Sequence, residues 1–304
     1  MASETLTPVA SERTGLLAAG AAVVMWGAGN VIVKQIAMSG IAIAFNRLWL
    51  GVLVFGALQF VRGGRPSRRA LWLAVPAGVA FTLDVSLFFV AIKHTSVADA
   101  SIITALQPAL VFVVAGRLFG EKVSWATVGW TVVAIAGAVG SVLASSAASG
   151  RTPGGDLLAV LSMIAWSAYF VLSKQCRQQL DTLEFQTSLT VVAALALTPV
   201  ALLTSHDLVP RDGATFGWIV VMVIVPGGGH LLMNWAHNYA PITVASMLTL
   251  GIPVFAAIGA AIALGEPITA GQCLGMGVVI VALGAVLRHH SAAAPIALTT
   301  PDTA

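Results

Sequence analysis

Long apolar runs are the feature of this sequence that most restricts its fold. A helix needs about 20 mostly apolar residues to cross the roughly 30 Å of hydrocarbon in a bilayer. Ten segments of the 304-residue chain have this character, and they lie near residues 15–37, 41–61, 70–92, 98–118, 124–145, 155–177, 183–204, 214–238, 242–263 and 269–287. Strands of a membrane barrel would alternate in polarity over about ten residues, and these runs do not. The sequence therefore predicts an all-α membrane protein with ten transmembrane helices.

Composition excludes the main soluble classes. Hydrophobic residues make up 58% of the chain and charged residues 9%, against about 45–50% and about 25% in soluble domains. The net charge of +3 is spread too thinly to form a nucleic-acid-binding face. Two cysteines offer no disulfide framework, and no ATP-binding phosphate loop occurs. We expect the lipid bilayer and a small molecule as partners, no nucleic acid, no cofactor and no metal. A proton is a candidate coupling ion, and the oligomeric state stays open.

The basic residues predict the orientation in the membrane, because Lys and Arg collect in short cytoplasmic loops. With the N-terminus inside, ten of the 15 basic residues lie on the inner side, four on the outer side, and Arg47 lies within a span. The sequence thus predicts a multi-pass inner-membrane protein with cytoplasmic tails at 1–14 and 288–304. The polar N-terminal segment, which contains Glu4 and Glu12, is not typical of a cleaved signal peptide.

The chain contains an internal repeat. Residues 91–121 align without gaps on residues 236–266, and residues 26–35 match residues 166–175. The matched positions include tryptophan, threonine, proline and Gly-Glu pairs, which is too ordered for chance composition.

The repeat divides the chain into two halves of five spans, 15–145 and 155–287, joined by a Gly- and Ser-rich linker at 146–154. Because five is odd, the second half is predicted to be inverted relative to the first. Inverted repeats place a binding site near the membrane midplane between the halves and allow alternating access to it.

Several repeated motifs resemble a known family. A Trp-Gly/Ser-Ala start occurs at Trp26 and at Trp166, and Gly-Glu-x-x-Ser/Thr joints begin at Gly120 and Gly265. With the Ala-x-x-His/Tyr-Thr/Ala turns into the fourth and ninth spans, these motifs look like the EamA branch of the drug/metabolite transporter superfamily. The resemblance implies a secondary transporter, not an enzyme, and often an exporter of amino acids or similar metabolites. It also implies a central cavity lined mainly by spans 1, 3, 4, 6, 8 and 9.

Two prolines, Pro108 and Pro253, fall near the centres of the fourth and ninth spans. Proline removes the hydrogen bond to the carbonyl four residues earlier, which here belongs to Thr104 and Thr249. These threonines could offer oxygens to a substrate at the midplane, and Gln107 adds a further polar group. A packing kink satisfied within the protein is the alternative.

The eighth span contains Pro226 followed by Gly227, Gly228, Gly229 and His230. Each glycine destabilises a helix interior by about 1 kcal/mol, so we expect a broken or flexible hinge at the glycines. Close packing against another helix is the alternative. The histidine could bind substrate, carry a proton or bond a neighbouring helix.

Asp84 is the one acid predicted deep within a span, where an ionised carboxylate costs about 2.5–3.5 kcal/mol. At about 1.5 Å per residue, Asp84 and Arg47 lie at similar depths towards the outer side, whereas His230 lies towards the inner side. A buried Asp84–Arg47 pair is therefore one interpretation. Recognition of a substrate amine and proton coupling are the others.

Trp26 and Trp166 lie near the middle of the first and sixth spans, deeper than the usual interfacial belt. Facing a cavity, they could stack on an aromatic or cationic substrate. Asn30, Tyr169 and Asn234 could supply hydrogen-bonding groups to the same substrate. Packing in the core is the alternative for both tryptophans.

These observations predict a secondary transporter that works by alternating access, with amino acids as the favoured substrates and export as the favoured direction. An importer of a vitamin or cofactor precursor such as riboflavin is the alternative, because aromatic residues would serve it equally well. An intramembrane enzyme would need catalytic groups at matching depth, for which His and Asp residues are too few. A receptor would need a soluble output domain, for which the tails are too short.

Overall fold

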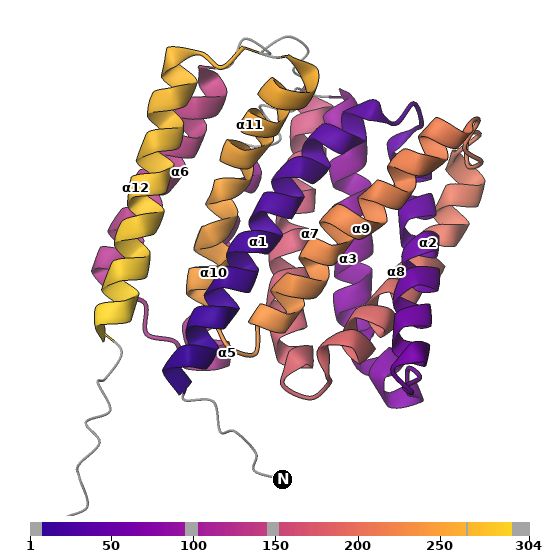
Figure 1. Ribbon diagram of the computed structural model, residues 1–304, viewed down its shortest axis with the longest axis horizontal. Helices are drawn as coiled ribbons and strands as arrows, with labels where there is room; N and C mark the ends of the chain where they lie inside the picture. Colours follow the sequence, from indigo (N-terminus) through magenta and orange to yellow (C-terminus); the bar gives the residue numbers. More distant parts are fainter. Residues whose placement is uncertain (1–7, 95–102, 145–151, 266, 294–304) are drawn as a thin grey trace, which may run out of the picture.

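The computed structural model describes residues 8–94, 103–144, 152–265 and 267–293, and its regular elements are helices. The first half contains α1 (Pro8–Gln35), α2 (Gly40–Val61), α3 (Arg68–His94), α5 (Gln107–Phe119) and α6 (Trp125–Leu143). The second half contains α7 (Pro153–Arg177), α8 (Thr182–Thr204), α9 (Gly213–Ala236), α10 (Ile242–Leu248), the 3-10 turn η1 (Thr249–Gly251), α11 (Ile252–Leu264) and α12 (Ala270–Ala293). Figure 1 shows them as one bundle.

Nine apolar helical segments in the described part of the chain are long enough to span a membrane, and α10, η1 and α11 together form one of them. The predicted span at 98–118 is represented by the 13-residue apolar helix α5, and residues 98–102 lie outside the described residues. The chain is thus an all-α membrane protein built from two five-helix repeats, as the length of the apolar runs predicts.

Several helices extend beyond the predicted spans. α1 begins at Pro8, α12 continues to Ala293, and α7 begins at Pro153, inside the predicted linker. Thr152 caps α7 by accepting a hydrogen bond from the Gly155 backbone, and proline is well suited to the first turn of a helix. A search for apolar residues detects the part of a helix in lipid and misses the polar turns that continue it.

The two repeats run in opposite directions. α1 begins and α12 ends at the same end of the bundle (Figure 1), which we call the proximal end, and the opposite end is the distal end. Glu12 near the start of α1 and Arg177 at the end of α7 line the same proximal pocket. The first helices of the two halves are therefore antiparallel.

The contacts between helices follow the repeat. α1 packs against α9 and α11, and its counterpart α7 packs against α3 and α5. α2 pairs with α8 and α6 pairs with α12; in Figure 1 these two pairs form opposite edges of the bundle. The central helices of each half thus pack mainly on helices of the other half.

Glycines allow the closest of these approaches. A Cβ atom on Gly275 of α12 would lie 2.5 Å from the Ser141 backbone nitrogen of α6, and one on Gly40 of α2 would lie 2.5 Å from the Phe89 carbonyl of α3. Real side chains essentially never approach so closely. Small residues are the usual means by which membrane helices pack.

Candidate functional site

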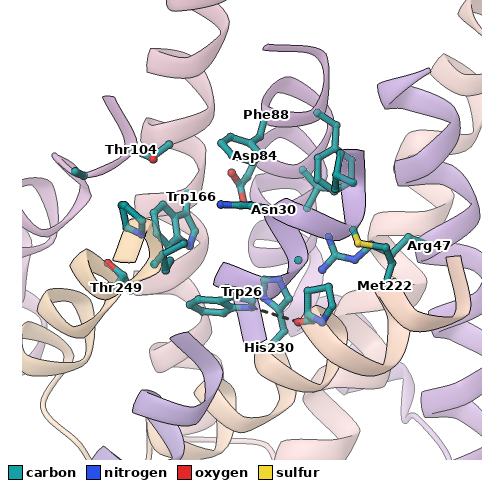
Figure 2. A pocket seen from close by; sticks show the side chains of 18 residues that line it. Trp26, Asn30, Arg47, Asp84, Phe88, Thr104, Trp166, Met222, His230 and Thr249 are labelled. Carbon is teal, nitrogen blue, oxygen red and sulfur yellow. Dashed lines mark hydrogen bonds between the residues drawn. The ribbon is translucent and has the colours of Figure 1, made fainter. Parts of the chain in front are cut away.

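A cavity lies in the centre of the bundle, between the repeats. Its wall includes the sequence-predicted residues Trp26, Asn30, Asp84, Thr104, Trp166, His230, Thr249 and Pro253 (Figure 2). The lining comes from spans 1, 3, 4, 6, 8 and 9, which the family resemblance implies, and also from Arg47 of α2.

The cavity extends from the middle of the bundle towards its distal end. Val33 lies near the end of α1, Phe89 near the end of α3 and Arg47 near the start of α2, and these positions are all distal. Trp166 and Pro253 lie at the middle of their spans. Within the described residues, no group of three or more His, Cys, Asp or Glu side chains could hold a metal ion.

Two tryptophans form an aromatic wall of the cavity. The rings of Trp26 and Trp166 meet edge to face with centroids 6.2 Å apart, and Trp26 lies 4.8 Å from the ring of His230. The Trp26 Nε1 atom donates a hydrogen bond to the Pro226 carbonyl at 3.2 Å, which fixes the indole against α9. Both tryptophans therefore line the cavity, as the substrate-stacking interpretation requires.

The Asp84 carboxylate is held by the other repeat. Its Oδ1 atom accepts a hydrogen bond of 2.9 Å from the hydroxyl of Ser162, a fully buried residue of α7. The expected ion pair with Arg47 is not among the contacts of the described residues, although both side chains line the cavity. The close packing of α3 on α7 brings a serine to the carboxylate, and spacing along the sequence does not reveal that contact.

Arg47 is 7% exposed, and its guanidinium lies 5.9 Å from the ring centroids of both Phe81 and Phe89. Such cation–π contacts contribute about 0.5–2 kcal/mol each, against a cost of roughly 2.5–3.5 kcal/mol for a cation at the centre of a membrane helix. No hydrogen bond from this guanidinium is found among the described residues. The sequence analysis named Arg47 only as a structural partner of Asp84 and missed its place in the cavity wall.

The apolar lining residues Phe88, Phe89 and Met222 were also missed. An apolar residue in an apolar span carries no signal of the cavity that it faces. The only signal that could have found Arg47 is its charge within a span.

Both midspan prolines begin a helical segment. Pro253 lies in the first turn of α11 after η1, and Pro108 lies in the first turn of α5. The Thr249 carbonyl, expected to be free, accepts the Ile252 backbone N–H, and its hydroxyl donates to the Ser246 carbonyl at 2.5 Å. The expectation of a freed carbonyl at Thr249 is wrong, because a 3-10 turn satisfies it.

Gln107 lies outside the cavity wall. Its side chain is fully buried, and its Oε1 atom accepts a hydrogen bond of 3.4 Å from the Thr249 hydroxyl. Its Nε2 atom has no partner within the described structure. Gln107 therefore connects the two broken spans and does not face the cavity directly.

The glycine run of the eighth span does not break the helix. α9 continues through Gly227, Gly228 and Gly229 to Ala236. A Cβ atom on Gly229 would lie 3.0 Å from Trp26 Nε1, and one on Gly228 would lie 2.9 Å from the Met25 side chain of α1. The expected broken helix is wrong, and the glycines instead allow α1 to pack closely against α9.

A polar network lies on the proximal side of the cavity. The Tyr169 hydroxyl lies 3.1 Å from His230 Nδ1 and 3.5 Å from Asn234 Oδ1. The Asn234 Nδ2 atom donates to Gln186 Oε1 at 2.7 Å. Tyr169 and Asn234 are therefore not part of the cavity wall, and His230 connects this network to the cavity.

Arg177 extends the network towards the proximal end. Its Nε atom donates to the Asn234 carbonyl at 2.9 Å, one Nη donates to the Thr182 hydroxyl at 2.6 Å, and the other donates to the Leu180 carbonyl. Burial, together with the charges of Lys174 and Arg177, lowers the pKa of nearby His237 to about 3. This histidine is therefore neutral at physiological pH.

A second set of polar contacts, which we call the proximal latch, joins the two repeats. Lys174 Nζ donates to Glu121 Oε1 at 2.9 Å. The same carboxylate accepts hydrogen bonds from the backbone of Ile242 at 2.7 Å, and from the backbone and hydroxyl of Thr243 at 3.0 and 2.8 Å. An anion at a helix N-terminus also interacts favourably with the helix dipole.

The pKa of Glu121 reflects these contacts. Burial alone would raise it, but the charge and hydrogen bond of Lys174 and the backbone donors of Thr243 and Ile242 outweigh burial and lower the pKa. Gly120, with φ of 66°, ends α5 in the left-handed conformation, so the Gly-Glu pair marks the end of the helix. The partners of the glutamate were not predicted.

Comparison with known proteins agrees with this architecture. The EamA-like transporter family matches residues 13–143 and 153–288, one copy in each repeat. The chain is 25% identical over 237 residues to the pseudopaline exporter CntI of Pseudomonas aeruginosa (strain UCBPP-PA14), covering 77% of this chain and 82% of the exporter. It is 26% identical over 254 residues to an uncharacterized transporter of Archaeoglobus fulgidus, covering 83% and 88%. A crystal structure with 18% identity superposes with a TM-score of 0.75 over 92% of this chain and 99% of that chain, and so shares the fold. The chain therefore belongs to the EamA-like transporter family.

Proposed function

We propose that this membrane transporter is a secondary transporter that exports small metabolites by alternating access, with amino acids as the leading substrates. The observation that carries the proposal is the central cavity, which lies between two antiparallel repeats and is separated from the proximal end by polar contacts. Inverted repeats with a midplane site are typical of secondary transporters.

The cavity wall supports a substrate with both apolar and polar parts. Trp26 and Trp166 offer ring faces and edges to an apolar or aromatic group. Asp84 offers a carboxylate to an amine, and Asn30 offers an amide. This combination fits an amino acid better than a purely apolar compound.

Charge and a relative support the proposed direction and orientation. The positive-inside rule predicts that the proximal end, where α1 begins and α12 ends, is cytoplasmic and that the membrane is the inner membrane. In that orientation the structure is closed towards the cytoplasm, with its cavity in the outer half. The similarity to a protein named as an exporter supports transport outwards.

Alternating access requires the proximal end to open. The breaks next to Pro108 and Pro253 are the hinges of this motion, because the hydrogen-bond ladder of each span is interrupted there. Gly227 to Gly229 are a third hinge, because each glycine weakens a helix interior by about 1 kcal/mol. Gly228 and Gly229 pack against α1, and Gly227 faces Phe55 of α2. Opening would separate the proximal latch and the Tyr169–His230 contact.

Uptake and counterflow in proteoliposomes test the proposal. Vesicles with the purified protein are offered panels of labelled amino acids, nucleobases and vitamins, and empty vesicles provide the background. We expect amino acids to move faster than in empty vesicles. Trp26→Ala should reduce this rate, whereas Trp72→Ala, at a side chain that is 77% exposed, should not. Movement of no panel member above background would contradict the proposed substrate class.

An importer of a vitamin or cofactor precursor such as riboflavin is the second candidate. The aromatic wall favours it, because stacked rings would bind a flat heterocycle. Growth of a vitamin auxotroph on limiting vitamin distinguishes the two functions. Rescue by this gene would support import, and no rescue together with amino acid counterflow would support export.

A further inference from the structure

One lining residue is chemically distinct from the rest of the cavity. Arginine stays positively charged in proteins, and the planar head of Arg47 carries five N–H donors. The guanidinium is held between the rings of Phe81 and Phe89, which have no acceptor atoms. Within the described residues, none of its five donors has a hydrogen-bonding partner.

The guanidinium also faces the substrate space. Arg47 lines the central cavity, and Figure 2 shows it on the side opposite Trp166, with Asn30 and Asp84 between them in that view. The Asp84 carboxylate attracts it electrostatically but has its direct hydrogen bond from Ser162. The arginine is therefore a fixed cation whose donors are left for another acceptor.

We propose that Arg47 binds a carboxylate of the transported substrate, in the two-bond geometry that guanidinium and carboxylate groups share. The substrate then carries a carboxylate at Arg47, an amine on the Asp84 side and an apolar or aromatic arm towards Trp26 and Trp166. This inference rests on the proposed transport function and deepens it. It assigns Arg47 as a specificity-determining residue, so that neutral amides and simple amines are poor substrates.

Four related compounds test the assignment in the wild-type protein. They are phenylalanine, phenylalanine amide, phenethylamine and 3-phenylpropionate, which share the aromatic arm and differ in the carboxylate or the amine. Binding is measured by thermal stabilisation in detergent micelles, and transport by counterflow of labelled phenylalanine in proteoliposomes. We expect phenylalanine to bind at least about tenfold more tightly than its amide or phenethylamine, because a hydrogen bond to a charged group contributes a factor of ten or more.

Substitutions at Arg47 then test whether this residue distinguishes phenylalanine from its amide. Arg47→Gln should bind phenylalanine and its amide equally, and Arg47→Lys should be intermediate, because an ammonium group cannot form two parallel bonds. Arg211→Gln, at an exposed arginine outside the cavity, is the matched control and should behave as wild type. If Arg47→Gln does not fold, Arg47→Lys and the wild-type compound series still decide the question.

Different results would contradict the role of Arg47 and the transport function. Equal binding of phenylalanine and its amide by the wild type would overturn the role of Arg47 and leave the transport function standing. Unchanged discrimination in Arg47→Gln would do the same. If none of the four compounds stabilises the protein or exchanges, the amino acid class of the proposed function fails, and the assignment of Arg47 to its carboxylate fails with it.

Discussion

The proximal latch predicts that Glu121→Gln shifts the transporter towards a state open at the proximal end. The neutral amide loses the attraction of Lys174 and places an NH₂ group where donors from Ile242, Thr243 and Lys174 now converge. At least one donor then faces another donor. The substitution barely changes side-chain volume, so its effect isolates charge and hydrogen bonding.

The expected magnitude lies between that of a surface pair and that of a buried pair. The side chains of Lys174 and Glu121 are 11% and 15% exposed. Surface ion pairs contribute about 0–1 kcal/mol, and breaking a buried pair costs about 3–5 kcal/mol. We therefore expect the closed state to lose about 2–3 kcal/mol relative to the open state, which changes their ratio by roughly 30- to 150-fold.

The assay is the distance between two spin labels across the proximal end, measured by pulsed electron paramagnetic resonance. Spin labels are placed at exposed Lys122 and Gln178, one in each repeat, in a background with the exposed Cys273 replaced by serine. Wild type should give a predominantly short distance at pH 7, and Glu121→Gln should add a longer population. Glu184→Gln is the matched control, because within the described structure this carboxylate accepts just one exposed backbone hydrogen bond, of 3.3 Å, from Ser67.

The pH dependence has a definite sign. The latch lowers the pKa of Glu121 in the closed state, so it stabilises that state fully above the ordinary carboxyl pKa of 4.5. This stabilisation disappears as the pH falls through the lowered pKa. Acid should therefore open the wild type and have less effect on Glu121→Gln. Identical distance distributions for the two proteins at pH 7 and in acid would refute the reasoning.

Three further substitutions test contacts elsewhere. Gly275→Ala should destabilise the protein in thermal unfolding by about 1–3 kcal/mol through overpacking, whereas Gly277→Ala, with open space at its Cβ position, should be neutral or slightly stabilising. Trp26→Phe should cost about 1 kcal/mol of stability by removing its Nε1 hydrogen bond, and transport assays should show that an aromatic ring at this position still supports activity. Asp207→Asn should cost less than about 1 kcal/mol in thermal unfolding. Its partly exposed carboxylate accepts hydrogen bonds of 2.5 and 2.7 Å from Ser39, and equal unfolding curves at pH 7 and in acid for the wild type would argue against this contact.

The sequence predicts the membrane architecture because lipid imposes a simple length requirement on every span. It also locates Trp26 and Trp166, since tryptophan in mid-membrane is unusual and both copies of the repeat carry it. Asp84 and His230 were found in the same way, by their polarity. These signals depend only on a residue and its depth.

Contacts between distant residues could not be predicted in this way. Ser162 reaches Asp84 across 78 positions, and Glu121 caps a helix that begins 121 positions later. α9 continues through three glycines, two of which, Gly228 and Gly229, pack against α1. Local helix propensity does not describe this packing. A 3-10 turn at Thr249 likewise satisfies a carbonyl that an ideal α-helix would leave free.

The edge pair of α6 and α12 contributes none of the residues that line the central cavity. Its close packing is internal to the pair, with Gly137 and Gly275 at the contact. Changes in this pair are therefore expected to alter how much protein accumulates in the membrane without altering which compound it carries. Evolution or engineering of new selectivity would instead act on α1, α2, α3, α7, α9 and the segments around Thr104 and Pro253, while the pair provides a fixed attachment point for labels or binding proteins.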